Sequence, residues 1–282
     1  MATYTSVMRF IEPWSQDQEL PFIRTNAEPG YKHMNFEWVD HSVRITDARD
    51  NKEDFTLHRH GFAYCDDAEG GTPEMLDVLR ENNHEKVRQL YYPHIEDLVK
   101  RETGASRVVI FDHTSRKRRP ELGTYDNPTG KEQPATMVHC DQSTKGALRR
   151  LEQNVPGNIH EILQKRVIMI NLWRPLRGPV QDWPLATMDY RTCRTNLIYP
   201  TDLLDKVDNY RGQTVTFGYA DEQEWYYLDK QRTDEVTMIK IWDSKEDVQA
   251  KLCPHVAFNH PNTPADTPPR ESIEVRCFAL FD

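Results

Sequence analysis

Apolar residues recur at helical spacing along one stretch of the chain, residues 73–103. Thr72 and Pro73 provide a capped start to this stretch, and Gly104 follows it as a residue that can end a helix. We expect Pro93 to divide the stretch into two helices, because proline lacks a backbone donor and collides with the preceding helical turn. The pattern therefore predicts a pair of helices ahead of the first well-defined strand.

Short β-rich stretches dominate the chain after this helical region. β-branched and aromatic residues fill these stretches, and Pro, Gly or Asp bounds most of them. We expect strands at residues 107–111, 166–173, 214–219, 224–228, 236–242, 255–259 and 272–281, and short helices at residues 145–153 and 159–165. A run of about eight strands with few helices predicts a mainly-β fold with flanking helices and a double-stranded β-helix, or jelly-roll, core.

A polar segment, residues 115–133, follows the first of these strands and is rich in Pro and Gly. We expect a surface loop or an active-site flap there. The basic run at residues 116–119 lies in this segment, but the whole chain carries 36 basic and 45 acidic residues, a net charge of −9. An acidic protein repels a phosphate backbone, so we interpret the run as a solvated loop and expect no nucleic-acid partner.

The length of 282 residues is compatible with one large core. We expect a single domain over residues 1–282, with core strands over about 107–282 and an N-terminal mixed α/β extension. The five cysteines are odd in number and include no Cys-x-x-Cys, which argues against a disulfide framework and a structural zinc site. No apolar run is long enough to cross a bilayer. We therefore expect a cytoplasmic protein with a small-molecule partner and no membrane partner; a homodimer is left open.

His139 and Asp141 stand two positions apart in an extended segment. Side chains two apart on a strand project to the same face, so this imidazole and carboxylate can meet one ion. Two histidines and one carboxylate leave three open positions on iron(II), which suits a metal that binds a co-substrate and oxygen. His94 and Glu96 share the spacing but lie in a helical pattern, where positions two apart diverge. An isolated pair of this kind is more often two residues that simply interact on a strand. The C-terminal sequence therefore decides whether His139 and Asp141 form a metal site.

The last predicted strand carries Arg270, Ser272, Glu274 and Arg276 on one face. Guanidinium groups bind carboxylates through two parallel hydrogen bonds, so two arginines beside a metal form a candidate seat for a dicarboxylate. Without a metal nearby, the same face would be a surface ladder of salt bridges around Glu274.

Several blocks of the chain together resemble a known family. They include Val138-His139-Cys140-Asp141-Gln142-Ser143, Asn171-Leu172-Trp173-Arg174-Pro175-Leu176 and Pro269-Arg270-Glu271-Ser272-Ile273-Glu274-Val275-Arg276, with further blocks at residues 104–114, 184–186, 225–227, 234–236, 243–244 and 255–258. These blocks are spread over most of the chain. In them the chain is similar to the fungal and bacterial iron and 2-oxoglutarate oxygenases related to AsaB-type hydroxylase/desaturases, gibberellin desaturase and the cephamycin methoxylation protein.

The resemblance implies a double-stranded β-helix that uses Fe(II), 2-oxoglutarate and molecular oxygen. The reaction it implies is the hydroxylation, desaturation, peroxidation or rearrangement of a secondary-metabolite intermediate of the terpenoid, meroterpenoid or polyketide class. The metal set that it implies is His139, Asp141 and His255. Arg270 would take the distal carboxylate of 2-oxoglutarate, and only by analogy with a nucleic-acid demethylase branch would Arg276 make a second contact.

Four further residues complete the expected site. Ser272 shares the face of Arg270 and is expected near the co-substrate. Asn171, Trp173 and Arg174 lie on a strand after the metal motif and are candidates for the substrate pocket, although Trp173 fits an ordinary core equally well.

The third metal ligand could be His255 or His260. They are five positions apart, an odd number, so on a continuous strand their side chains point to opposite faces. His255 shares its face with Ala257, whereas His260 precedes Pro261, where a strand is expected to end. The pattern favours His255, but a bulge between the two histidines would favour His260.

Two other classes of function remain open. One is a non-catalytic subunit of the same fold that partners an active paralogue, and the intact metal set argues against it. The other is a cupin-like metal hydrolase or isomerase, in which three ligands hold zinc or manganese without a co-substrate. The two arginines of the last strand disfavour it, because a hydrolase needs no seat for a dicarboxylate.

Overall fold

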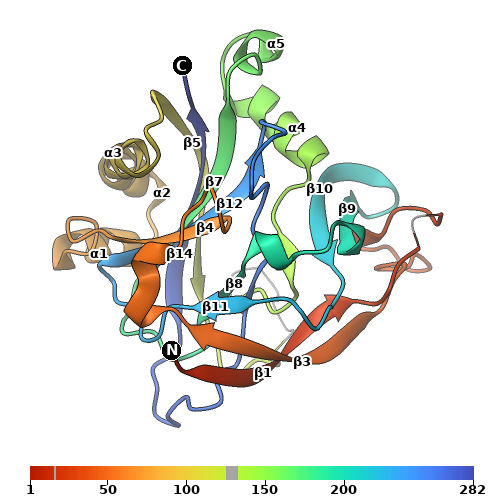
Figure 1. Ribbon diagram of the computed structural model, residues 1–282, viewed down its shortest axis with the longest axis horizontal. Helices are drawn as coiled ribbons and strands as arrows, with labels where there is room; N and C mark the ends of the chain where they lie inside the picture. The colour runs from red at the N-terminus through yellow and green to blue at the C-terminus, as the bar shows by residue number, and fades with distance from the viewer. Residues whose placement is uncertain (16, 125–132) are drawn as a thin grey trace.

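Two curled β-sheets pack against each other in the computed structural model, which describes residues 1–15, 17–124 and 133–282 (Figure 1). The larger sheet has the order β1-β3-β11-β8-β13-β6-β10-β9-β2. Its strands are β1 (Thr3–Ile11), β2 (Phe22–Thr25), β3 (Trp38–Asp47), β6 (His139–Cys140), β8 (Leu185–Met188), β9 (Ile198–Asp205), β10 (Asn209–Phe217), β11 (Trp225–Tyr227) and β13 (His255–Ala257). The smaller sheet has the order β4-β12-β7-β14-β5. Its strands are β4 (Phe62–Asp66), β5 (Arg107–Lys117), β7 (Val167–Pro175), β12 (Glu235–Asp243) and β14 (Glu271–Leu280).

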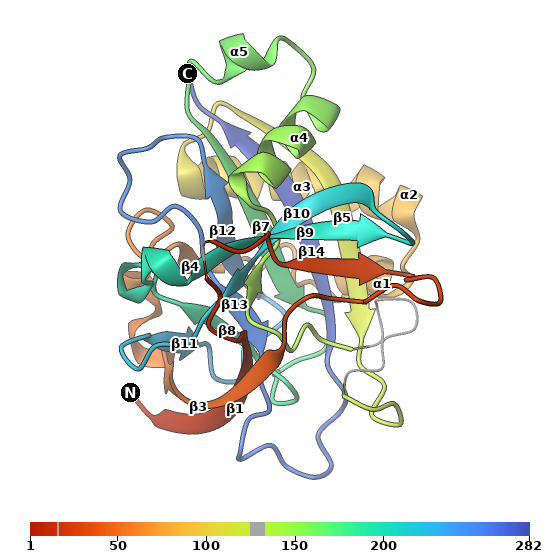
Figure 2. The same ribbon diagram turned by 90° about the vertical axis from the view of Figure 1, so that its right-hand side faces the viewer.

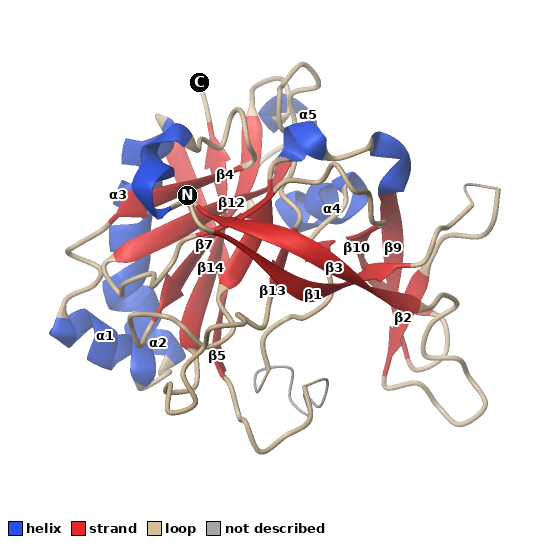
Figure 3. Ribbon diagram, turned by 60° about the horizontal axis from the view of Figure 1, so that its bottom comes forward, coloured by secondary structure: helices blue, strands red, loops and turns tan. Residues whose placement is uncertain are grey.

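Helices cover the outer face of the smaller sheet. The α-helices are α1 (Pro73–Arg80), α2 (His84–Lys86), α3 (Tyr92–Thr103), α4 (Thr144–Asn154) and α5 (Ile159–Ile162). Short helical turns are η1 (Arg49–Asp54), η2 (Val87–Tyr91), η3 (Tyr190–Thr192) and η4 (Thr195–Leu197). Helices α1 to α3 gather on one side of the strands (Figure 3), and α4 lies against β10 (Figure 2). The mainly-β jelly-roll fold with flanking helices is thereby confirmed.

Strand β7 shows how the sequence builds two cores. All nine of its residues are buried. Val167 and Met169 point into the core between the sheets, whereas Ile168 and Ile170 point into the core beneath the helices. A strand buried on both faces needs apolar residues at nearly every position, which explains why only Asn171 and Arg174 of β7 carry polar side chains.

The helical region begins and ends as expected but divides elsewhere. Thr72 caps α1, accepting a hydrogen bond from the backbone of Met75, and Gly104 ends α3 at φ +73°. The break falls at Asn82, which has φ +53°, so the expectation that Pro93 divides the helices is wrong. Pro93 lies in the first turn of α3, directly after the π-helical turn η2. Its missing N–H costs little in a first turn.

The segment at residues 115–133 is only partly a loop. Strand β5 continues to Lys117 and pairs Arg116 with Ser272 of β14, so the expectation of a loop is wrong for residues 115–117. Residues 118–124 form turns and irregular chain, and residues 125–132 lie outside the described residues. Among the residues that are described, no helix is both long and apolar enough to cross a membrane.

One buried ion pair ties β7 to the helical layer. Arg174, on the helix-facing side of β7, pairs with Asp67 beyond the end of β4, and the two side chains are 0 % and 2 % exposed. The Arg174 guanidinium also donates to the Tyr91 hydroxyl at 2.7 Å and to the Thr233 carbonyl at 2.5 Å. These contacts turn its side chain away from the space between the sheets.

Replacing Arg174 by methionine should therefore destabilise the fold strongly. The Arg174→Met change removes the guanidinium partner of the buried Asp67 carboxylate and leaves it only the His94 ring, whose Nε2 lies 2.9 Å away, which costs about 3 kcal/mol. The matched control is Arg194→Met, which removes an exposed ion pair with Glu222 and should cost less than about 1 kcal/mol. Urea unfolding of the two variants checks the difference, and equal losses would contradict a structural role for the pair.

Candidate active site

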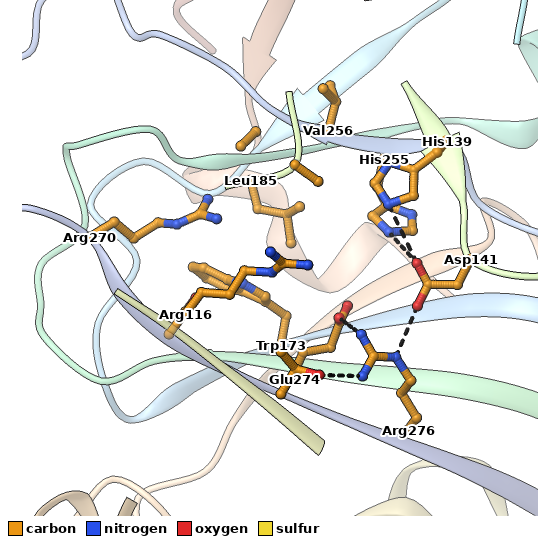
Figure 4. Close-up of a pocket in the computed structure, with 14 residues that line it drawn as sticks. Arg116, His139, Asp141, Trp173, Leu185, His255, Val256, Arg270, Glu274 and Arg276 are labelled. Atoms are coloured by element: carbon orange, nitrogen blue, oxygen red, sulfur yellow. Dashed lines mark hydrogen bonds and ion pairs between the residues drawn. The ribbon is translucent and has the colours of Figure 1, made fainter. Parts of the chain in front are cut away.

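His139 and His255 are brought together by the pairing of two short strands of the larger sheet. They are direct cross-strand partners on β6 and β13, with ring centroids 4.5 Å apart. Asp141 follows β6 and places its Oδ1 atom 3.4 Å from His139 Nε2 and 3.8 Å from His255 Nε2. One ligand atom from each residue lies within 4.8 Å of the other two. Two imidazoles and a carboxylate thus face one point (Figure 4).

The backbone fixes which ring nitrogen faces that point. His139 Nδ1 lies 2.8 Å from the Met137 carbonyl, and His255 Nδ1 lies 3.0 Å from the Cys253 carbonyl. A carbonyl only accepts, so each Nδ1 must donate, and Nε2 is the nitrogen that each ring turns toward Asp141. Burial would lower the pKa of His139, but the hydrogen bond to Asp141 outweighs burial and raises it, so in the metal-free protein His139 Nε2 donates to Asp141. Each ring offers the Nε2 lone pair to a metal in its neutral form. Burial, with the neighbouring His139, lowers the pKa of His255, which favours its neutral form.

Opposing effects act on the Asp141 carboxyl. Burial alone would raise its pKa, but the His139 hydrogen bond and the charge of Arg276 outweigh burial and hold the pKa well below the usual range. Asp141 is therefore an anion in the folded protein. A buried anion facing two imidazole Nε2 atoms is the donor chemistry of a divalent metal site.

Arg270 carries a buried positive charge at the other end of the same pocket. Within the described residues, no carboxylate forms an ion pair with its guanidinium, which donates to the Trp183 carbonyl at 2.6 Å and lies 5.5 Å from the Trp173 ring. Burial, with the nearby Arg116, lowers the pKa of Arg270 to about 9. The Asp182 carboxylate holds the backbone N–H of Arg270 at 2.8 Å. Arg270 is thus fixed in place without an ion-pair partner among the described residues, although the nearby charges of Asp182 and Glu274 favour its charged form.

Arg276 does not point toward this end of the pocket. Its Nε donates to Asp141 Oδ2 at 3.0 Å, its Nη2 to Glu274 at 2.6 Å and its Nη1 to the Thr114 hydroxyl at 2.9 Å. Its charge is compensated by two carboxylates, although it lines the same pocket, and the expected contact of Arg276 with the co-substrate stays a prediction. The face-sharing pattern was right about the strand but could not show which carboxylates the opposite sheet supplies.

The remaining expected residues lie on β7 and β14. Trp173 and Ser272 line the pocket. Asn171 lies behind Asp141 and donates to its Oδ2 at 2.8 Å. Arg174 points to the helices, so its expected place in the pocket is wrong, because adjacent residues of a strand face opposite sides.

Three polar residues of the pocket were not anticipated as functional. Arg116 reaches into the pocket from β5, although it was interpreted as part of a solvated loop (Figure 4). Thr114 and Glu274 also line it. The signal that could have found Arg116 is strand alternation, since it lies opposite Ser272 on the paired strand.

His260 is held in a different place. Its Nε2 lies 3.0 Å from the Tyr227 hydroxyl, and its ring packs against Tyr4. Strand β13 ends at Ala257, so His260 follows the strand. The structure therefore brings His255, and not His260, to His139 and Asp141.

A jelly roll with two histidines and one carboxylate facing a single point defines the class of mononuclear metal oxygenases that keep open coordination positions. Comparison with known proteins agrees. The family model described as "Oxidoreductase/YMDC permease-like domain" matches residues 8–280. The Fe(II)/2-oxoglutarate-dependent dioxygenase nvfI of Aspergillus novofumigatus is 37 % identical over 275 residues, covering 98 % of this chain and 96 % of the relative.

Two further comparisons point the same way. The hydroxylase/desaturase CTB9 of Cercospora beticola is 31 % identical over 88 % of this chain and 79 % of its own length. A solved structure of the iron and alpha-ketoglutarate-dependent endoperoxidase NvfI superposes with a TM-score of 0.91 at 35 % identity, covering 99 % of this chain and 98 % of that one. The chain belongs to this family of Fe(II)/2-oxoglutarate-dependent oxygenases.

The contrast between Arg270, just before β14, and Arg276, on β14, predicts opposite effects on the ligand-free protein. Arg270→Met removes a buried charge without an ion-pair partner among the described residues and should raise the free energy of unfolding by roughly 1–3 kcal/mol. Arg276→Met strands the Asp141 and Glu274 carboxylates and should lower it by about 3 kcal/mol or more. Chemical denaturation of metal-free protein checks both, and a destabilised Arg270→Met variant would contradict the unpaired charge.

Proposed function

We propose that this chain is a dioxygenase that uses Fe(II), 2-oxoglutarate and molecular oxygen to oxidise a small-molecule intermediate of secondary metabolism. The observation that carries the proposal is the pairing, in one pocket, of a His139-Asp141-His255 cluster with the buried charge of Arg270. A metal site alone would fit several activities. A metal site with a buried arginine at the far end of the pocket fits a dicarboxylate that bridges them.

The donor set fits iron(II). Imidazole nitrogens and a carboxylate oxygen are ligands that non-haem iron accepts, and three protein ligands leave positions for a co-substrate and oxygen. His139 and His255 would bind through Nε2, and Asp141 through Oδ1. The carbonyls of Met137 and Cys253 support this assignment, because they hold both rings in the required tautomer.

Arg270 is the proposed partner of the distal carboxylate of 2-oxoglutarate. Its burial makes such a bond strong, since a charged hydrogen bond gains strength where water is excluded. The Trp183 carbonyl and the Asp182 carboxylate fix its position before the ligand arrives. Ser272 lies on the same face of β14 and is a further hydrogen-bonding group for the co-substrate.

Bound iron and 2-oxoglutarate would supply the oxidising chemistry. The chain's own residues bind and orient the co-substrate, exclude water and place one substrate C–H bond near the metal. The relatives are named as an endoperoxidase, as hydroxylase/desaturases and, for one in Aspergillus oryzae, as an aspirochlorine biosynthesis protein. Hydroxylation, desaturation, peroxidation or rearrangement of a terpenoid, meroterpenoid or polyketide is the corresponding proposal for this chain.

The wider organisation is part of the same proposal. Residues 1–282 would act as one domain, because β1, β3 and β4 of the N-terminal part complete both sheets. A cytoplasmic location, the absence of a nucleic-acid partner and a homodimer remain predictions. Different features disfavour the two alternative functions. A metal hydrolase needs no co-substrate and so has no use for Arg270, and a non-catalytic subunit needs no intact set of metal ligands.

The choice of His255 over His260 can be tested by metal content. His255→Ala removes a proposed ligand and should abolish stoichiometric iron and turnover. His260→Ala removes only a contact with Tyr227 and should retain most of both. Iron retained in His255→Ala and lost in His260→Ala would reverse the assignment.

Asp141→Ala should also lose iron, because the proposed site then keeps two neutral ligands and no anion to bind a hard divalent ion. Iron assay after anaerobic loading, with succinate production as the second readout, checks this variant. Succinate formed at the wild-type rate would contradict the role of Asp141.

The co-substrate site can be tested by anaerobic titration. Iron(II) followed by 2-oxoglutarate should produce a weak visible charge-transfer band, because the chelated keto acid binds the metal directly. Arg270→Met should weaken the binding of 2-oxoglutarate by about 100-fold or more, since an unpaired buried carboxylate costs several kcal/mol. A band that needs no Arg270 would move the carboxylate seat elsewhere, and no band in the wild type would contradict the proposed function.

A further inference from the structure

The two oxygens of the Asp141 carboxylate face different partners. Oδ1 lies toward the Nε2 atoms of His139 and His255. Oδ2 accepts hydrogen bonds from Asn171 Nδ2 at 2.8 Å and from Arg276 Nε at 3.0 Å. The larger sheet therefore supplies the residues around one oxygen, and β7 and β14 of the smaller sheet supply the donors to the other. Figure 4 shows the two histidines and Arg276 on either side of the carboxylate.

Glu274 closes these contacts into a ring. It accepts from Asn171 Nδ2 at 3.1 Å through Oε1 and from Arg276 Nη2 at 2.6 Å through Oε2. The register of the smaller sheet produces this arrangement, because Arg276 lies directly opposite Asn171 and Glu274 opposite Trp173. Both donors to Asp141 are thus held by a second carboxylate and have little freedom to turn away.

The asparagine is kept at a cost to stability. Asn171 is fully buried, and its Oδ1 accepts no hydrogen bond from any residue that the structure describes. A buried acceptor left in this state costs about 1–3 kcal/mol. Flipping the amide would not help, because Oδ1 would then face the carboxylates of Asp141 and Glu274. An apolar residue at this position of β7 would leave no unsatisfied oxygen in the core.

We propose that Asn171, Arg276 and Glu274 are positioning residues that hold Oδ2 of Asp141 away from the metal, so that Asp141 binds through Oδ1 alone. The inference rests on the proposed metal site. An octahedral ion with three single-point protein ligands keeps three positions, enough for a chelating keto acid and oxygen. A carboxylate that bound through both oxygens would fill one of these positions.

The test compares Asn171→Leu with the wild-type full chain. Leucine has a similar size and removes the donor to Oδ2; the lost hydrogen bonds to Asp141 and Glu274 are offset in part by the removal of the unsatisfied amide oxygen, so the melting temperature of the metal-free protein should fall only modestly. Co(II) affinity, measured anaerobically by competition with a chromophoric chelator, should weaken by about 10- to 100-fold. A purely structural role for Asn171 predicts no such change in a folded variant.

The matched control is Thr237→Val. Thr237 lies on β12, the strand next to β7, and the change removes its buried hydrogen bond to Gln231. It should keep the wild-type Co(II) affinity. Should Asn171→Leu not fold, Glu274→Gln tests the same ring, because it keeps the volume but removes the charge that holds both donors. Its affinity should also fall by roughly 10-fold.

The outcomes separate the two claims. Wild-type protein that binds no Co(II), or binds it equally without His255, overturns the proposed metal site. Wild-type protein that binds Co(II) through His255, with a folded Asn171→Leu or Glu274→Gln variant whose affinity stays within about threefold, overturns the positioning role alone.

Discussion

The buried carboxylate of Asp141 is the point on which the two sheets depend. It stands between imidazoles of the larger sheet and a guanidinium of the smaller sheet, and it can remain ionised at that depth only because both sides compensate its charge. The short pairing of β6 with β13 places His139 and His255 side by side, next to this carboxylate. A shift of one residue in that pairing would turn one imidazole into the core and leave the carboxylate unpartnered on its larger-sheet side.

The charge at the far end of the pocket follows a different principle. Arg276 is neutralised by protein carboxylates, whereas Arg270 has no such partner among the described residues and is held only by a carbonyl and an aromatic face. Arg270 and Arg276 thus differ in their surroundings: Arg276 completes the protein's own hydrogen-bond network, and Arg270 is the proposed partner of the ligand. An unmatched buried charge is costly to fold and is retained where binding repays that cost.

Much of this could be predicted from the sequence where local pattern decides structure. The apolar residues of β7 and the alternation in β14 predicted their strands. The strand end expected before Pro261, and not the odd spacing, separates His255 from His260, because β13 ends at Ala257. Prediction failed where partners distant in sequence decide. Pro93 was tolerated because it falls in a first turn, and Arg174 faces the helices because Asp67 and Tyr91 lie there. No local pattern reveals that Arg276 forms an ion pair with Asp141, which lies more than a hundred residues earlier in the chain.

The most direct measurement is anomalous diffraction from crystals grown anaerobically with iron(II) and 2-oxoglutarate. The iron peak should lie between the Nε2 atoms of His139 and His255 and a single oxygen of Asp141, with the distal carboxylate of 2-oxoglutarate on the Arg270 guanidinium. An iron peak away from these three residues, or a distal carboxylate seated on another cation, would contradict the proposed active site.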